Sequence, residues 1–304
     1  MIAFPFFRIM PRAKPPDNVP HVTLHQGLHG RPQWCDGSRL RGTAWASGVH
    51  CVFHPPAPET SRLFRMPDTY SQYAHICERF YDLSTDQKSA AGFVLTLLEA
   101  RAGQRALFVG SMLGVAEHLV AHGLALTVVD HSEEMVELAR RRLPGAVVRQ
   151  ADLRSLPFDA CFDFVVVIGR VFTHLISEDD LTAGLHACRR AVAHAGVVLV
   201  DNYESGKILR TAYFNGAIQV RDERSRIVRR STTELLTETP LVVRWKASYT
   251  GIHEGAPFSF DDTIEQRAWS RDEIHARMSS SGFSVLRQGD NFDDTSFYTL
   301  ARAV

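Results

Sequence analysis

The sequence has no net charge of either sign, because its 34 lysines and arginines balance its 34 aspartates and glutamates. A chain without a basic excess lacks the electrostatic footprint of a nucleic-acid-binding protein. The apolar start MIAFPFF is too short to span a bilayer, and the small-residue cleavage site of a signal peptide is missing. We therefore expect a cytoplasmic protein that binds neither nucleic acid nor a membrane.

The sequence also lacks the cysteine spacing of a disulfide framework or a zinc site. Its five cysteines are irregularly spaced, and no two of them form a CxxC pair. His50 and His54 lie on either side of Cys51, which allows a metal site, but we favour scattered polar residues in an unstructured arm. We expect no metal site and free thiols at Cys35, Cys51, Cys77, Cys161 and Cys188.

Residues 1–65 differ in composition from the rest of the chain. They hold nine of the fourteen prolines and five histidines, without a sustained apolar period. This composition is typical of a loop-like or disordered segment. An alternative is that translation begins at Met66 and that residues 1–65 are a mis-annotated extension, which the mass of the native protein would test.

Residues 66–304 show a regular alternation of strand-like and helical runs. Two helices are predicted first, over 69–80 and 87–100. Continuous apolar runs separated by helices then indicate a parallel sheet covered on both faces. The predicted strands are 106–109, 124–129, 146–149, 164–168 and 197–201, and the predicted helices between them are 115–122, 133–142 and 179–193.

The pattern changes after the fifth strand. Short runs that mix apolar and polar residues predict an antiparallel insert over about 203–268. A helix over 271–281 and strands over 284–288 and 296–302 would follow. The predicted fold is therefore α/β, a doubly wound, seven-stranded Rossmann-like sheet, with an antiparallel insert that caps the substrate site.

Three features lie where such sheets bind ligands, beyond the carboxyl ends of the strands. The turn Gly110–Gly114 joins the first strand to a helix, whose N-terminus favours a carboxylate ligand. Asp130 ends the second strand and can accept both hydroxyls of a ribose, although it can also cap the next helix. Asp152 follows the third strand and can accept a hydrogen bond from an adenine amine, or be an ordinary turn residue. Together the three predict an adenosine site.

The run RALFVGSMLGVAEHLVAHGLALTVVDHSEEMVELARRRLPGAVVRQADLRSLPFDACFDFVVVIGRVFTHL resembles class I S-adenosylmethionine-dependent methyltransferases. More narrowly, it resembles the small-molecule N-methyltransferases that include the aminosugar N,N-dimethyltransferases of antibiotic pathways. The resemblance covers roughly residues 70–304, and VVDHSEEMVELARRR is its most specific stretch. It implies S-adenosyl-L-methionine as the cofactor and a small molecule as the acceptor.

The resemblance also implies which residues contact that cofactor. Those expected at its methionine part are Gly110, Ser111 and Gly114. Those expected around its adenosine are Asp130, His131, Met135, Asp152 and Leu153. Those expected at its sulfonium are Ile168 and Gly169, and the residue expected to close over it from a helical lid is Tyr73 or Tyr81.

His174 is the residue expected to take part in the chemistry. The resemblance places it at a histidine that faces the substrate, with Thr173 in place of a glycine. An amine must react unprotonated, so His174 would act as a base or orient the amine, unless it merely caps a loop. Arg170 can contact an anionic acceptor group, although we expect a solvated arginine. Aromatic residues that can wall the acceptor pocket, or simply fill the core, are Tyr203, Trp245 and Tyr249.

The chain departs from this family at its glycine-rich turn. Phe108 stands where the family has an acid, and Met112 replaces a central glycine. Loss of a carboxylate that recognises the cofactor's ammonium group would weaken affinity about tenfold to hundredfold.

We expect an enzyme that methylates a small metabolite in natural-product biosynthesis, and we favour a nitrogen over an oxygen as the atom that is methylated. The alternatives are a degenerate methyltransferase fold that serves as a non-catalytic binding or partner subunit and, more distantly, an NAD-dependent enzyme. The oligomeric state is open, a homodimer being one option.

Overall fold

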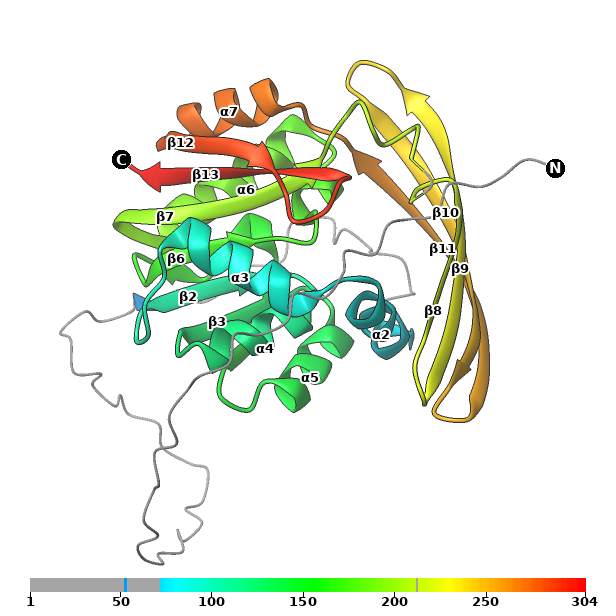
Figure 1. Cartoon of the computed structure of the whole chain (residues 1–304). Coiled ribbons are helices and arrows are strands. Elements are labelled where there is room, and N and C mark those ends of the chain that lie inside the picture. Colours follow the sequence, from blue (N-terminus) through cyan, green and yellow to red (C-terminus); the bar gives the residue numbers. More distant parts are fainter. Residues whose placement is uncertain (1–51, 54–71, 212) are drawn as a thin grey trace, which may run out of the picture. The chain divides into compact units, whose positions relative to one another are not determined.

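The computed structural model describes residues 52–53, 72–211 and 213–304, all of them in the compact unit Ala46–Val304 (Figure 1). Of the segment 1–65, only the short strand β1 (Val52–Phe53) is described, and it pairs antiparallel with β5 (Phe158–Asp159). The rest of that segment lies outside the described residues, as do the proposed start at Met66 and the histidines around Cys51. The predicted disorder of residues 1–65 therefore stays a prediction.

A seven-stranded sheet with the order β12-β13-β7-β6-β2-β3-β4 forms the centre of this unit. From β2 the chain builds toward β4 on one side and then continues with β6 and β7 on the other. Strand β13 is antiparallel to both of its neighbours, whereas β2, β3, β4, β6 and β7 run parallel. The predicted doubly wound, seven-stranded fold is confirmed. The strands are β2 (Arg105–Val109), β3 (Ala125–Asp130), β4 (Val147–Gln150), β6 (Phe162–Val167), β7 (Val192–Tyr203), β12 (Phe283–Asp290) and β13 (Ser296–Ala303).

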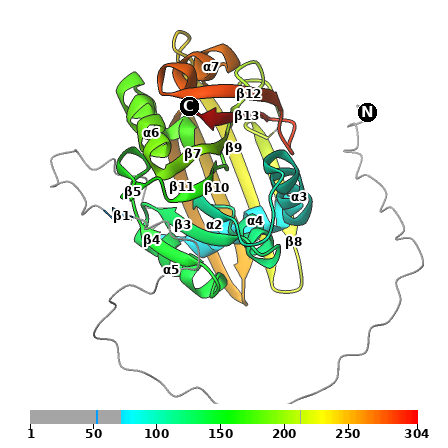
Figure 2. The same ribbon diagram turned by 90° about the vertical axis from the view of Figure 1, so that its left-hand side faces the viewer.

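Helices cover both faces of this sheet, and successive residues of each strand face opposite helix layers. Leu107 and Val109 of β2 pack in one core with α6 (Glu178–Ala191) and α7 (Arg271–Ser280). Ala106 and Phe108 of the same strand pack in a second core with α3 (Gln87–Leu98), α4 (Leu113–Ala121) and α5 (Glu133–Arg142) (Figure 2). Among the described helices, none is long and apolar enough to cross a bilayer.

The predicted insert is a separate antiparallel sheet with the strand order β11-β10-β9-β8. Together with α2 (Ala74–Ser84) it encloses a third core, to which β7 contributes Tyr203 (Figure 1). The insert also contacts the 3₁₀ helix η2 (Val171–His174), which follows β6: Gln266 donates a hydrogen bond to Thr173 Oγ1 at 3.3 Å. The insert is thereby fixed at the carboxyl end of β6. Its strands are β8 (Gly216–Arg221), β9 (Ser225–Thr237), β10 (Val242–His253) and β11 (Ala256–Arg267).

Candidate active site

A pocket of about 860 Å³, including its open mouth, lies at the carboxyl ends of β2, β3, β4 and β6. Eight of the predicted site residues line it, namely Gly110, Ser111, Asp130, His131, Asp152, Leu153, Gly169 and His174. Sequence reasoning did not single out the remaining lining residues, which are Val109, Ala151, Arg154, Val171, Leu175 and Asp180. The pocket lies at the edge that a doubly wound sheet offers to ligands.

Two turns with left-handed backbone shape one wall of the pocket. Gly110 has φ 97°, and a Cβ added there would lie 2.5 Å from Val171 Cγ2, so only glycine fits. In the second turn, Gly169 has φ 88° and Arg170 has φ 64°. Met112 has φ 73° and thus keeps the left-handed conformation although it is not glycine. The turn after β2 therefore retains its shape at the cost of some strain.

Asp130 ends β3 with its side chain only 13% exposed. Its Oδ1 accepts a hydrogen bond from the Ser132 backbone N–H at 2.8 Å, and His131 Nδ1 lies 3.4 Å away. Ser132 in turn caps α5, because its hydroxyl accepts from the Met135 N–H at 3.3 Å. Asp130 therefore supports the start of α5 and lines the pocket at the same time.

Asp152 follows β4 and faces the same pocket as Asp130. The Ala151 N–H donates to the Asp130 carbonyl at 2.9 Å, which ties the ends of the two strands together. The Asp152 carboxylate accepts from Arg154 Nη2 at 2.6 Å and Nε at 3.0 Å, and from the Arg154 N–H at 2.8 Å. Burial alone would raise the pKa of Asp152, but these hydrogen bonds outweigh it and lower that pKa. Asp152 is thus held ionised, and Arg154 was missed as its partner.

His174 ends η2 and lines the pocket. Its Nδ1 is buried and has no hydrogen-bond partner among the described residues. Burial lowers the pKa of His174 to about 4, with a further lowering by His131 and an opposing effect of Asp130. The imidazole is therefore neutral at pH 7, and the described residues leave the hydrogen-bonding capacity of Nδ1 unused.

Residues 107–196, which include all three of these side chains, match the family model of a methyltransferase domain. The chain carries a methyltransferase domain.

In the described part of the chain, no group of three or more histidine, cysteine or acidic side chains is placed to hold a metal ion.

Individual proteins show the extent of the similarity. A putative methyltransferase of Bacillus subtilis (strain 168), YqeM, is 25% identical over 185 residues, or 60% of this chain and 73% of YqeM. A phosphatidylethanolamine N-methyltransferase of Cereibacter sphaeroides is 31% identical over 135 residues, or 42% of this chain and 65% of that protein. The structure of S-adenosylmethionine-bound CalS10, an amino pentose methyltransferase of Micromonospora echinaspora involved in calicheamicin biosynthesis, has a TM-score of 0.60 at 18% identity. The match covers 76% of this chain and 95% of CalS10, so the fold is the one that the sequence predicted.

Two buried carboxylates hold the two turns of the methyltransferase domain, and sequence reasoning missed both. Asp201, at the end of β7, accepts hydrogen bonds from the Gly169 N–H at 3.1 Å and the Arg170 N–H at 2.7 Å, and burial raises its pKa to about 6. Glu78 of α2 accepts hydrogen bonds from the Met112 and Leu113 N–H groups at the start of α4. The sequence predicted that the N-terminus of this helix binds a ligand carboxylate, but these two N–H groups are already occupied by Glu78. The only sequence signal for Asp201 is an acid directly after an apolar strand.

Five of the predicted cofactor contacts do not line the pocket of the methyltransferase domain. Gly114 packs against α2 and α3, where an added Cβ would lie 2.8 Å from both Asp82 Oδ1 and Gln87 Cγ. Met135 and Ile168 are core residues, 2% and 1% exposed. The two tyrosines, Tyr73 and Tyr81, belong to the core between α2 and the insert, where Tyr73 stacks on Phe260 with ring centroids 4.1 Å apart. The cofactor contacts expected of these five residues stay predictions.

The core between α2 and the insert also holds the aromatic residues expected at the acceptor side. Tyr203, Trp245 and Tyr249 are buried there. Arg229, which sequence reasoning missed, is 1% exposed and lies over the rings of Phe80, Tyr213 and Trp245 at 4.8, 4.5 and 5.2 Å. The expectation of a solvated Arg170 is wrong, because that side chain is buried and paired with Asp293 at 2.6 Å.

Proposed function

We propose that the methyltransferase domain transfers a methyl group from S-adenosyl-L-methionine to a nitrogen of a small metabolite. The observation that carries this proposal is the joint placement of Asp130, Asp152 and His174, whose Nδ1 has no partner among the described residues, around one pocket. The match to the methyltransferase family and the S-adenosylmethionine-bound CalS10 of the same fold support the choice of methyl donor.

The residues that line the pocket support an adenosine bearing a sulfonium group as the ligand. The ends of β3 and β4 are about 4.8 Å apart, as neighbouring strands are, so Asp130 can hold the ribose while Asp152 faces the adenine amine. Leu153 and Leu175 add apolar surface for the adenine ring. The carboxylates of Asp130, Asp152 and Asp180 outnumber the one guanidinium of Arg154 in the lining, which favours a cationic ligand.

His174 would orient the acceptor nitrogen. A neutral Nδ1 can accept a hydrogen bond from an amine N–H and leave the nitrogen lone pair directed at the methyl group. S-adenosylmethionine supplies the methyl group on a sulfonium, and the transfer depends on in-line alignment with the attacking nitrogen. The nitrogen becomes positively charged as the C–N bond forms, so its N–H donates more strongly to His174 and its proton then leaves to solvent.

A nitrogen acceptor also agrees with what the similar proteins are. One relative is a phosphatidylethanolamine N-methyltransferase, and CalS10 is an amino pentose methyltransferase of calicheamicin biosynthesis. We therefore propose an amine of a small natural-product intermediate as the substrate class. The alternative of a non-catalytic subunit is not favoured, because the pocket keeps its carboxylates, its histidine and the left-handed turn at Met112 despite the loss of the acid at Phe108.

Calorimetry with S-adenosylhomocysteine tests the cofactor, and turnover of a panel of small amines tests the chemistry. We expect saturable binding and an N-methylated product identified by mass spectrometry. Matched acceptors with a hydroxyl in place of the amine should react poorly. Absence of binding at millimolar S-adenosylhomocysteine would reject the proposal, and preferred methylation of the hydroxyl compounds would reject its nitrogen part.

A further inference from the structure

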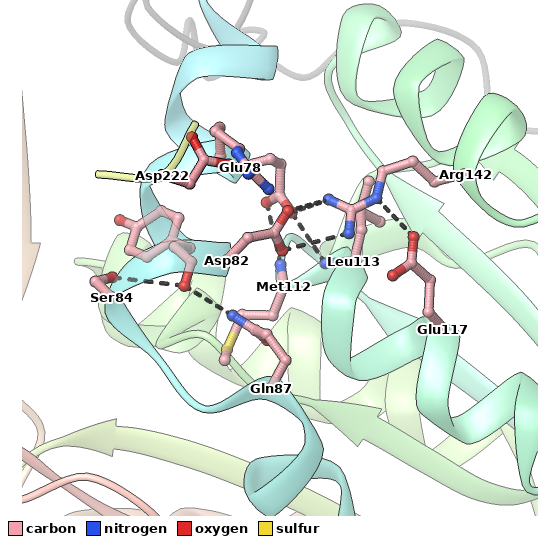
Figure 3. A network of polar contacts seen from close by, with 11 residues as sticks. Glu78, Asp82, Ser84, Gln87, Met112, Leu113, Glu117, Arg142 and Asp222 are labelled. Carbon is pink, nitrogen blue, oxygen red and sulfur yellow. Dashed lines mark hydrogen bonds and ion pairs between the residues drawn. The ribbon is translucent and has the colours of Figure 1, made fainter. Parts of the chain in front are cut away.

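Glu78 lies almost wholly buried on α2, 1% exposed, and reaches the turn that follows β2. Its Oε1 accepts a hydrogen bond from the Met112 N–H at 3.2 Å, and its Oε2 accepts from the Leu113 N–H at 3.0 Å (Figure 3). These amides belong to the N-terminal end of α4, where Met112 is the N-cap and provides no side-chain cap. The first amides of a helix have no partner within the helix. The cap of α4 therefore comes from a residue more than thirty positions earlier in the chain.

Burial of a carboxylate is unfavourable unless hydrogen bonds or a cation compensate for the lost hydration. Burial raises the pKa of Glu78 to about 7, the two amide hydrogen bonds lower it, nearby Asp82 raises it and Arg142 lowers it. The first-turn amides of a helix can be satisfied by a local serine or aspartate at the N-cap, as Ser132 does for α5. A distant, buried carboxylate does something that a local cap cannot do, because it fixes α2 relative to the turn.

Arg142 of α5 completes this contact. Its guanidinium lies 3.7 Å from Glu78 Oε2 and donates to Asp82 Oδ2 at 2.9 Å and to Glu117 Oε1 at 2.8 Å (Figure 3). One cation thus faces three carboxylates from α2 and α4. Because the single positive charge is shared, Glu78 depends on the two turn amides for the rest of its stabilisation.

The turn that Glu78 holds also shapes the pocket. Gly110 and Ser111, directly before Met112, line the pocket. Met112 is buried next to the second turn, since a Cβ added at Gly169 would lie 3.4 Å from Met112 Cγ. A shift of Met112 would therefore change both turns that border the pocket. Asp201 holds the second turn by the same means, with one carboxylate on two consecutive amides.

We propose that Glu78 is a positioning residue for methyl-donor binding: from α2 it holds the Gly110–Gly114 turn, and Arg142 holds Glu78. This role rests on the proposed function, and it explains how the turn keeps its shape with Met112 in place of a glycine. Glu78 does not contact the donor, because it lies outside the pocket lining.

The test compares Glu78→Ala and Glu78→Gln with the wild-type chain. Glu78→Ala removes both acceptors, and we expect the Kd for S-adenosylhomocysteine and the KM for the donor to rise at least about tenfold. The kcat at saturating donor should change by less than about threefold, because no group at the reacting atoms is removed. Glu78→Gln keeps one acceptor oxygen and should lie between the two. If Glu78→Ala fails to fold, Glu78→Gln carries the test.

Amide hydrogen exchange of the unliganded protein gives a readout that needs no cofactor. Glu78→Ala should speed exchange at Met112 and Leu113 at least about tenfold, while the central amides of α4 stay protected. Glu137→Gln is the matched control, since exposed Glu137 of α5 pairs with Arg141 and contacts neither Glu78 nor the turn amides, and it should change neither exchange nor affinity. Two results would overturn the proposal. One is a folded Glu78→Ala protein with wild-type exchange at the two amides and wild-type affinity. The other is a fall in kcat as large as the rise in KM, together with faster exchange throughout the protein. If the wild-type chain binds no S-adenosylhomocysteine, the proposed function fails, while the exchange data still decide whether Glu78 holds the turn.

Discussion

Replacement of His174 by alanine is expected to slow methyl transfer without changing the shape of its pH dependence. A free amine has a pKa of about 10, and burial lowers the pKa of His174 to about 4. A difference of about 6 in pKa makes proton transfer from an ammonium group to this imidazole unfavourable by about 8 kcal/mol. In the proposed mechanism His174 is therefore a hydrogen-bond acceptor and not the base that deprotonates the acceptor amine.

The expected magnitude follows from this hydrogen bond. It strengthens when the attacking nitrogen becomes positive, and a charge-assisted hydrogen bond contributes about 1.5–3 kcal/mol. His174→Ala should therefore lower kcat about tenfold to hundredfold, with a smaller effect on KM. Exposed His186 on α6 gives the control variant His186→Ala, which should retain wild-type kinetics.

The assay is the dependence of kcat/KM on pH between about 6 and 9 for the wild type and both variants. The neutral form of His174 dominates throughout this range, because its pKa is about 4. The wild-type and His174→Ala profiles should then differ by a constant factor, with the acid limb set by the amine. An ionisation near pH 6.5 that is present in the wild type and absent from His174→Ala would refute this reasoning and make His174 a titrating base.

Three further substitutions test the site and its support. Asp130→Asn should raise the Kd for S-adenosylhomocysteine about tenfold to hundredfold in calorimetry, because an amide accepts a ribose hydroxyl more weakly than a carboxylate does; an unchanged Kd would remove Asp130 from ribose binding. Phe108→Asp, which restores the family's acid, should not tighten binding and should lower the melting temperature clearly, because Phe108 is fully buried in an apolar core; tighter binding would contradict this. Arg170→Met should destabilise the fold by about 1–3 kcal/mol in urea denaturation, because half-buried Asp293 loses its cation and keeps only its hydrogen bonds from Thr295 and Ser296, and adding Asp293→Asn should recover part of this loss.

The regular elements could be predicted from the sequence because their periodicities are local. The helix over 133–142 agrees with α5 residue for residue, and the strands of the sheet agree within a few positions. The boundary after α6 was wrong: the predicted helix continued to residue 193, but Val192 already pairs with Phe162. A β-branched valine next to a parallel strand gains more from the sheet than from another helical turn.

The predicted pocket residues were found where local motifs follow a strand directly, as Asp130 and Asp152 do. The supporting residues could not be found in this way, because their partners are distant in sequence. Glu78 contacts a turn 34 residues away, and Arg170 pairs with Asp293 across 123 residues. Such pairings depend on how the elements dock, which cannot be predicted from a local sequence pattern.

The cytoplasmic location and the homodimer stay predictions.

The end of β11 connects the insert to the segment that carries the histidine. Gln266 donates to Thr173 Oγ1 at 3.3 Å, Arg267 donates to the Ile176 carbonyl at 3.3 Å, and the Trp269 indole donates to the Leu175 carbonyl at 3.2 Å. Exchange of the insert for one from another enzyme would therefore also displace the imidazole, unless these three donors were transplanted with it. If the insert sets acceptor preference and His174 orients the acceptor, as proposed, these two properties are inherited as one unit.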